Sequence, residues 1–141
     1  MRDNRPSPAV YELLEEVGRA ADTRELLCTL GERLGAVLAF DALRVYRPSD
    51  SAPVGEIRRA GETRRPVFSR GARTGSPASP GFRSMLAAPL EDGEGVAGVL
   101  AIYSFEAAAF SPEDLGAVLW IRADLARALR KAMRAEATAL V

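Results

Sequence analysis

The chain has 141 residues and no histidine, and that absence excludes several kinds of site at once. Without an imidazole there is no histidine base, no histidine metal ligand, and no Ser-His or Cys-His nucleophile pair. The single cysteine, Cys28, cannot form an internal disulfide and is a poor start for a zinc site. We therefore expect no bound metal and no internal disulfide.

The sequence also lacks a long apolar run and an excess of either charge. No segment approaches the roughly 20 apolar residues that cross a bilayer, and the polar start MRDNRPSP is unlike a signal peptide. Nineteen basic residues balance nineteen acidic ones, so no overall field favours nucleic acid or an anionic membrane. We expect a cytoplasmic domain that contacts neither. Arginine supplies nearly all the positive charge, which is typical of GC-rich bacterial genomes.

What the sequence does contain is a clear order of helices and strands. Apolar residues recur at helical spacing after Ser7-Pro8, after Asp22 and after Ser111-Pro112, and each start carries N-terminal capping chemistry. Between these helices, apolar runs and alternating patterns favour strands, with Asp92-Gly93 as the hairpin turn between the best two. The expected strands span residues 42–47, 54–60, 66–69, 85–90 and 96–104.

This order favours an α+β fold, in which a central antiparallel sheet of about five strands is flanked by N- and C-terminal helices. At this length we expect one domain. We assign residues 1–21 to an N-terminal helix that is a candidate dimerisation element. Residues 22–141 then form the domain itself, which ends in a long helix.

Two patterns resemble cofactor or catalytic motifs but have simpler structural explanations. Residues 93–98 match G-x-G-x-x-G letter for letter, yet a dinucleotide loop must open a helix, and these glycines open a strand. The acidic pairs Glu15-Glu16 and Glu113-Asp114 lie on a helix surface and at a helix start. Because neighbours in sequence do not face one shared site, we do not expect paired-carboxylate catalysis.

Two other features each leave two interpretations open. The arginines between Arg58 and Arg83 form either an anion-binding rim or a charged edge that keeps this segment soluble. Trp120 projects away from the apolar stripe of the last helix. It therefore belongs either to an interface or to a second packing layer under the first helix.

Several phrases of the sequence occur together in one known family. They are residues 22–27, residues 43–46, RSMLAAPL at residues 83–90, and FSPEDL at residues 110–115. In this order they resemble the GAF domain family, whose members are small sensory modules of signalling and transcription proteins with a GAF/PAS-like sheet. The resemblance extends from about Asp22 to the last helix. It implies a regulatory binding module rather than an enzyme.

The chain departs from the family pattern in its middle segment and in its ligand signature. Only residues 61–82 are available for the helical excursion that covers the ligand in relatives, so we expect a reduced lid. Tyr103-Ser104-Phe105 stands where the cyclic-nucleotide signature carries asparagine and lysine. No Cys-His pair is present for a bilin and no histidine for haem, so we expect no cofactor. The single cysteine also argues against the family's methionine-sulfoxide reductases.

The resemblance leads to a specific functional expectation: a bacterial regulatory domain that senses a small molecule, dimerises, or does both, and acts on an output domain or partner protein. The alternative is a ligand-free protein-protein interaction module on the same fold. Positional carry-over places the ligand-binding side chains on the sheet face under the middle segment: Tyr46, Phe68, Arg70, Arg83, Ser84 and Tyr103. Small or outward-facing side chains on the second and last helices are the candidate homodimer contacts: Cys28, Gly31, Gly35, Trp120 and Arg127.

Overall fold

The computed structural model describes residues 8–47, 55–69 and 81–139, and every element below lies within these ranges. The helices are α1 (Pro8–Gly18), α2 (Thr23–Arg33), the short 3₁₀ helix η1 (Leu34–Ala36), α3 (Gly55–Thr63) and α4 (Pro112–Ala139). The strands are β1 (Ala42–Tyr46), β2 (Val67–Ser69), β3 (Ser84–Asp92) and β4 (Gly95–Ser104).

The described strands form one antiparallel sheet in the order β1-β4-β3-β2. β3 and β4 pair along their whole length, from Ser84 opposite Ser104 to Asp92 opposite Gly95. β1 pairs with the other side of β4, and β2 with the other side of β3. The predicted antiparallel α+β fold is confirmed, and so are four of the five predicted strands.

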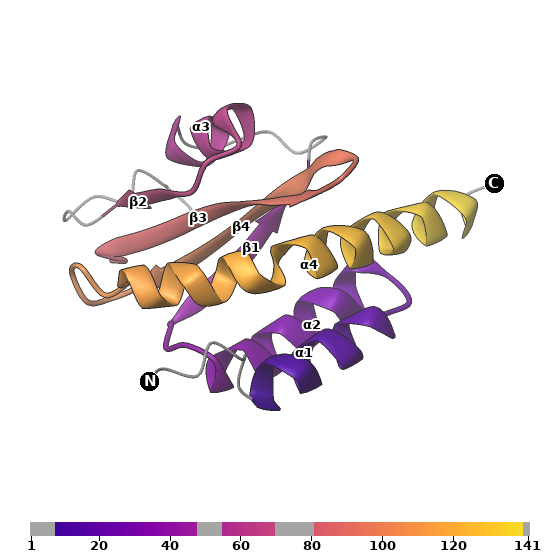
Figure 1. Ribbon diagram of the computed structural model, residues 1–141, viewed down its shortest axis with the longest axis horizontal. Helices are drawn as coiled ribbons and strands as arrows, with labels where there is room; N and C mark the ends of the chain where they lie inside the picture. Colours follow the sequence, from indigo (N-terminus) through magenta and orange to yellow (C-terminus); the bar gives the residue numbers. More distant parts are fainter. Residues whose placement is uncertain (1–7, 48–54, 70–80, 140–141) are drawn as a thin grey trace.

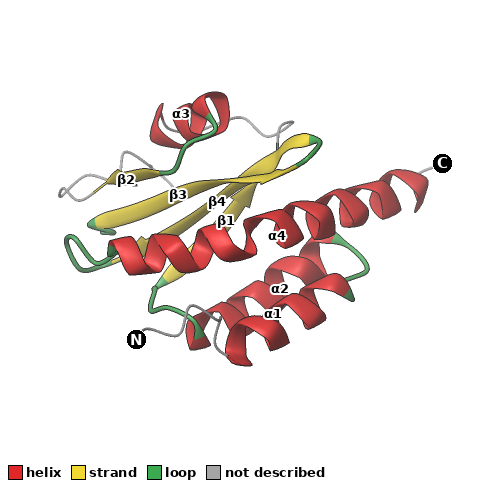
Figure 2. Cartoon of the chain, in the orientation of Figure 1, coloured by secondary structure: helices red, strands yellow, loops and turns green. Residues whose placement is uncertain are grey.

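Helices cover both faces of this sheet, but unequally (Figure 1 and Figure 2). The helices α2 and α4 lie against one face, with α1 packed on them, and we call this the helix-bundle face; α3 lies on the other, the α3 face. Successive strand residues point to opposite faces, so β3 and β4 contribute to both cores. Leu86, Leu100 and Ile102 are buried on the helix-bundle face, and Met85 and Tyr103 on the α3 face.

The predicted strand at residues 54–60 is wrong, because most of this segment belongs to helix α3. Ile57 and Ala60 are three residues apart, so a helix places both on one side, and both are buried against the sheet. Glutamate, arginine and alanine, which are good helix formers, dominate the segment. The described sheet therefore has four strands rather than about five, and β1 lies at its edge.

The helix α4 begins where the sequence predicts and packs along the helix-bundle face. The Ser111 hydroxyl accepts the Asp114 N–H at 3.2 Å, and the Asp114 carboxylate accepts the Ser111 N–H at 2.8 Å. This reciprocal capping satisfies amides that have no partner inside the helix. The large aliphatic side chains that α4 buries recur at helical spacing: Val118, Ile121, Leu125 and Leu129.

The start of α2 carries the predicted capping pair and a second carboxylate from α4. The Asp22 side chain accepts the Glu25 N–H at 2.8 Å, and the Glu25 side chain accepts the Ala21 N–H at 3.1 Å. In addition, the Glu136 carboxylate accepts the Thr23 N–H at 2.9 Å and the Thr23 hydroxyl hydrogen. These bonds from Thr23, the hydroxyl above all, hold the pKa of Glu136 below its usual range.

The glycines of residues 93–98 form a hairpin, as predicted, and not a phosphate loop. The Asp92 side chain accepts the Glu94 N–H at 2.9 Å, and Gly95 has a φ of 117° that favours glycine. Gly98 has a different role. A Cβ at this position would lie 2.6 Å from the carbonyl oxygen of Tyr46 and 2.9 Å from a methyl group of Leu129. Only glycine allows β1, β4 and α4 to approach so closely.

The helix α1 shares the core of the helix-bundle face. Val10, Leu13 and Val17 are buried there beside α2 and α4. Ser7, the predicted cap of this helix, lies outside the described residues. None of the described helices combines the length and the apolar character that a bilayer crossing requires.

Candidate functional site

Among the described residues, a single short helix covers the α3 face, and the core on this face is correspondingly small. α3 inserts Ile57 and Ala60 between the sheet and solvent, with exposed fractions of 2% and 0%. Gly61 lies close to the strands, since a Cβ there would be 3.4 Å from a methyl group of Val99. The buried sheet residues beneath α3 are Met85, Ala87, Val99, Ala101 and Tyr103.

Four aromatic residues extend from this core to the surface, and we call them the aromatic ladder. The hydroxyls of Tyr46 and Tyr103 lie 3.3 Å apart, within hydrogen-bond distance. The Phe82 ring stacks on Tyr103 with ring centroids 5.3 Å apart, and on Phe105 with centroids 4.5 Å apart. Tyr103 is buried, whereas Phe105 is 55% exposed. The ladder therefore joins a half-buried pair of tyrosine hydroxyl groups to an accessible aromatic surface.

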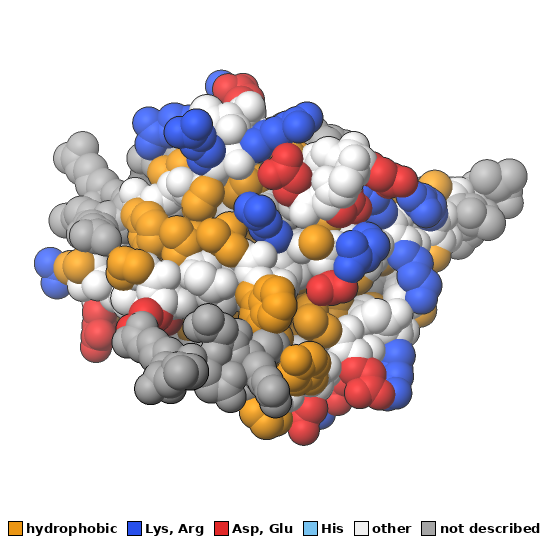
Figure 3. Space-filling model, viewed as in Figure 1, with side chains coloured by type: hydrophobic (Ala, Val, Ile, Leu, Met, Phe, Trp, Pro, Cys, Tyr) orange, Lys and Arg blue, Asp and Glu red, His pale blue; other side chains and the backbone are white. Residues whose placement is uncertain are grey.

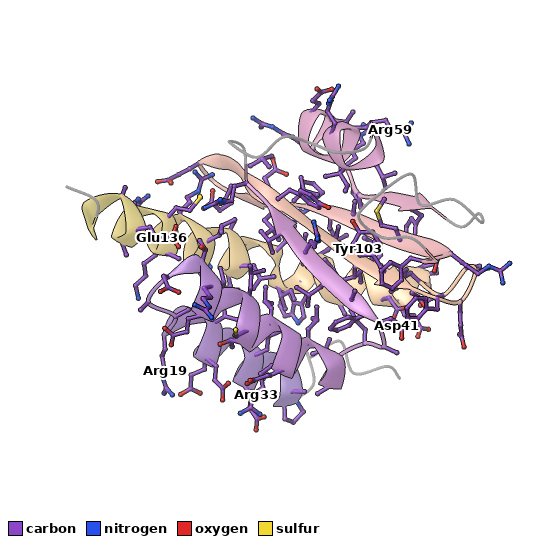
Figure 4. All side chains as sticks on the ribbon, turned by 180° about the vertical axis from the view of Figure 1, so that it is seen from behind. Arg19, Arg33, Asp41, Arg59, Tyr103 and Glu136 are labelled. Atoms are coloured by element: carbon purple, nitrogen blue, oxygen red, sulfur yellow. The ribbon has the colours of Figure 1, made fainter. Side chains whose placement is uncertain are left out.

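Exposed arginines surround α3. Arg58 and Arg59 lie on its outer side, and Figure 4 shows Arg59 pointing away from the sheet. Arg64 follows the helix with a φ of 58°, and its guanidinium lies 3.6 Å from the Glu91 carboxylate. Guanidinium groups at such a rim suit carboxylate or phosphate groups on a ligand.

The structure brings together only part of the predicted ligand-binding set. Tyr46 and Tyr103 meet on the α3 face, and Arg83 is exposed at the beginning of β3 next to Phe82. Arg70 lies outside the described residues.

Two of the predicted ligand-binding residues lie on the helix-bundle face instead. Phe68 pairs with Leu86 across β2 and β3 and packs against the core of that face. The Ser84 hydroxyl donates to the Glu106 carbonyl at 2.6 Å and accepts the Ala109 N–H at 3.3 Å. Ser84 therefore holds the connection between β4 and α4. Adjacent strand residues point to opposite faces, so Arg83 and Ser84 cannot both face one ligand.

Sequence reasoning did not select Phe82 and Phe105, although both stand next to strands that it predicted. Phe82 precedes β3 by two residues and Phe105 follows β4 directly. Because β3 and β4 are antiparallel, the start of one lies beside the end of the other, as the pair Ser84 and Ser104 shows. Two phenylalanines at such matching ends are a signal that sequence alone contains.

The predicted dimer residues are all exposed, but they belong to two separate surfaces. Cys28, Gly31 and Gly35 lie on α2 and η1, and Trp120 and Arg127 on α4. Trp120 is 57% exposed, so it is not covered by the first helix. α4 lies toward the viewer in Figure 1, whereas α2 lies toward the viewer in Figure 4, which is seen from behind. One flat interface therefore does not contain both groups.

α4 is tied to the β3–β4 hairpin by ion pairs. The Arg130 guanidinium lies 3.2 Å from the Asp92 carboxylate and donates to the Gly95 carbonyl at 3.0 Å. The Glu94 backbone N–H, and then Arg130, hold the pKa of Asp92 below its usual range. Beside these pairs, Arg127, Arg134 and the turn line an open hollow of about 310 Å³. These contacts fasten the β3–β4 hairpin to the last helix.

The sequence and the fold identify the family. The profile of the GAF domain family matches residues 6–129, so the chain belongs to this family. The resemblance of the sequence phrases to GAF domains is confirmed. No curated protein sequence matches the chain.

Several solved structures share the fold. The GAF domain of a phosphoenolpyruvate-protein phosphotransferase from Coxiella burnetii has a TM-score of 0.76 at 17% identity, over 92% of this chain and 95% of that chain. A free methionine-R-sulfoxide reductase from Neisseria meningitidis, solved in complex with its substrate, has a TM-score of 0.71 at 16% identity, over 96% and 98%. The GAF domain of a two-component sensor histidine kinase from Bacillus halodurans has a TM-score of 0.64 at 17% identity, over 81% and 97%.

Identities this low show a shared fold alone. Sensor domains and an enzyme both appear among these neighbours, and one fold serves unrelated functions. GAF domains are small-molecule binding or regulatory modules, and the particular function must be argued from the side chains of this chain.

Proposed function

We propose that this chain is the regulatory domain of a bacterial, cytoplasmic signalling or transcription-regulating protein, and that it binds a small planar molecule at the open end of the α3 face. The observation that carries the proposal is the aromatic ladder. Its outer ring, Phe105, is half exposed, so a planar ligand has a surface on which to stack. The hydroxyls of Tyr46 and Tyr103 would then fix the orientation of the ligand.

The arginines around this face favour a ligand with an acidic substituent. Arg83 is exposed next to Phe82, and Arg58 and Arg59 are exposed on α3. Guanidinium groups pair with carboxylates or phosphates in two-point geometry. Aromatic acids and phosphorylated aromatic compounds are thus the first ligands to test.

We propose that the domain binds its ligand without catalysing a reaction on it. Its only thiol, Cys28, is exposed on α2, which covers the helix-bundle face. The aromatic ladder lies on the α3 face. A ligand stacked on the ladder is therefore separated from this nucleophile by the sheet.

A thermal-shift screen tests the ligand proposal. Nucleotides, small organic acids and planar aromatic acids are added to the purified chain, and the unfolding temperature is measured. A ligand present at 100 times its Kd stabilises the folded state by about 2.7 kcal/mol. Phe82→Ala and Tyr46→Phe should reduce that stabilisation, while Tyr11→Phe, on exposed α1 surface, should not. Stabilisation that is the same in all three variants would place the ligand elsewhere.

We further propose that the chain forms a homodimer through α1 and α4. Tyr11 and Trp120, on these two helices, are 59% and 57% exposed. Figure 3 shows hydrophobic side chains gathered around the beginning of α4 and between α4 and α1, while charged side chains surround the β3–β4 hairpin. Exposed aromatic residues at such a patch are typical interface anchors.

Light scattering during size-exclusion chromatography tests the dimer. We expect a dimer for the native chain and a larger monomer fraction for Trp120→Ala. Gly31→Arg, on the other side of the helix layer, is the matched control and should leave the dimer intact. A monomer at tens of micromolar that Trp120→Ala does not change would contradict the proposal.

The alternative function, a ligand-free interaction module, is favoured by one specific observation. Ile57 and Ala60 are almost fully buried, and they fill the centre of the α3 face with the chain's own side chains. If no compound in the screen stabilises the chain while the dimer persists, this alternative is the better description.

A further inference from the structure

β1 forms an edge of the sheet, and this edge is a consequence of the helix that replaces the expected second strand. β1 pairs with β4 on one side only, and no other strand of the described residues pairs with it. In Figure 4, β1 lies toward the viewer between α2 and α3. An edge strand presents a row of unpaired N–H and C=O groups, which is a template for an additional strand.

Beside this edge, on the helix-bundle face, lies a cavity of about 160 Å³. Its apolar walls come from β1, α2 and α4, and Leu27 on α2 is 36% exposed. A cavity of this volume accommodates one aliphatic or small aromatic group. The residues that line the cavity are Thr23, Leu26, Leu27, Val45, Arg47 and Leu129.

A strand added to β1 would use this cavity through its alternate side chains. Val45 points to the helix-bundle face, where it packs against the core. Side chains of an added strand that share this direction would lie beside Val45 and Leu27. Every second residue of the added strand would therefore be aliphatic.

The positive charge of Arg44 on β1 indicates which residues should alternate with the aliphatic ones in the added strand. Arg44 is the middle residue of β1 and is exposed, and no acid among the described residues pairs with it. Directly opposite side chains of neighbouring strands interact, so an acidic residue opposite Arg44 stabilises pairing. Two antiparallel β1 strands centred on each other would instead place Arg44 opposite Arg44, which disfavours a second copy at this edge.

We propose that the outer edge of β1 binds an extended segment of a partner protein in which aliphatic side chains alternate with acidic ones. Main-chain hydrogen bonds to β1 supply the affinity. The cavity beside Leu27 and the charge of Arg44 supply the specificity. This interaction surface shares β1 with the aromatic ladder, to which Tyr46 belongs, and it is separate from the α1–α4 surface.

A labelled peptide tests this proposal on the intact chain. The probe is a short, capped peptide of alternating valine and glutamate, and its binding is measured by fluorescence anisotropy. Amide NMR shifts that concentrate on β1 and on α2 near Leu27 are expected. A peptide with lysine in place of glutamate, and one with every second amide N-methylated, should bind at least about fivefold more weakly.

Charge reversal supplies the decisive control. Arg44→Glu should weaken the glutamate peptide about fivefold or more and strengthen the lysine peptide. Arg19→Glu, the same change at an exposed residue beyond the end of α1, should alter neither. Leu27→Asp should weaken both peptides, and circular dichroism would verify that each variant is folded. Absence of binding at millimolar peptide, or equal binding to the native chain and Arg44→Glu, would overturn the proposal.

Discussion

The two faces of the sheet are supplied by the same strands but covered very differently. Among the described residues, the helix-bundle face buries 21 side chains under three helices, whereas the α3 face buries seven under one nine-residue helix. The thin cover leaves an aromatic ring and two hydroxyl groups close to solvent. The thick cover stabilises the fold, and the thin one makes a binding site available.

Polar groups also differ between the faces. On the helix-bundle face, the buried serines Ser84 and Ser104 are bonded to the connection that leads into α4. On the α3 face, Tyr46 and Tyr103 bond to each other. A serine that holds backbone is unavailable to a ligand, while a pair of hydroxyls can exchange one partner for another.

The sharpest test of this comparison is the same substitution on both faces. Ile121→Ala on α4 should lower the free energy of unfolding by about 3 to 5 kcal/mol, because the surrounding core cannot collapse into the space. Ile57→Ala should cost about 2 kcal/mol, since the short α3 can shift towards the sheet. Urea unfolding followed by circular dichroism measures both losses. Equal losses would contradict the division of roles between the faces.

Gly98→Ala probes the contact of β1, β4 and α4 and should have the next largest effect. The added methyl meets the Tyr46 carbonyl and Leu129, so we expect a loss of about 1 to 3 kcal/mol in the free energy of unfolding. Gly31→Ala is the matched control, because nothing lies within 4 Å of its Cβ position. Because Gly31 lies within helix α2, this control should raise the free energy of unfolding by up to about 1 kcal/mol. If Gly98→Ala leaves the free energy of unfolding unchanged, the three elements can move apart at little cost.

Tyr46→Phe should have a smaller effect, because it removes one hydrogen bond on the thinly covered face. We expect a loss of about 1 kcal/mol in chemical unfolding. Tyr11→Phe removes a hydroxyl from an exposed side chain and should change nothing measurable. If the two substitutions have the same effect, the pair of hydroxyls does not contribute to stability.

Glu136→Gln should show the smallest effect and a distinctive dependence on pH. The folded state lowers the pKa of this carboxyl below its ordinary value of 4.5, chiefly through the Thr23 hydroxyl. The stabilisation is therefore present above that pH and is lost as the pH falls through the lowered value. Thermal unfolding of the variant should differ from the native chain at neutral pH and converge with it in acid. If the variant differs from the native chain by the same amount at neutral and at acid pH, the bonds from Thr23 to Glu136 do not stabilise the fold.

Elements whose signals are local could be predicted from the sequence. The hairpin of residues 85–104 and the starts of α2 and α4 depend on turn residues, capping pairs and apolar spacing within a few positions. Segment 54–60 was misassigned because its few apolar residues suit a strand as well as a helix. The folded sheet presents an apolar face at this point, and a helix can bury both Ile57 and Ala60 against it. That face exists only after the strands have paired.

The candidate site shows the same limit. Tyr46 and Tyr103 were placed correctly on one face, since the register of β1 and β4 brings them together. Phe68 and Ser84 were not, because a shift of one residue along a strand moves a side chain to the opposite face. Phe82 and Phe105 flank the matching ends of a hairpin that the sequence predicts, so their contact follows from the pairing of β3 and β4.

Local sequence signals thus determined where most helices of this chain begin and where its hairpin turns. The sequence phrases were also sufficient to identify the GAF family. The pairing of strands and the packing of helices decided which face is thickly covered, which tyrosines meet, and that β1 became an edge. Those outcomes depend on contacts between residues far apart in the chain. Capping pairs, turn residues and apolar spacing act over a few residues, so they cannot specify such contacts.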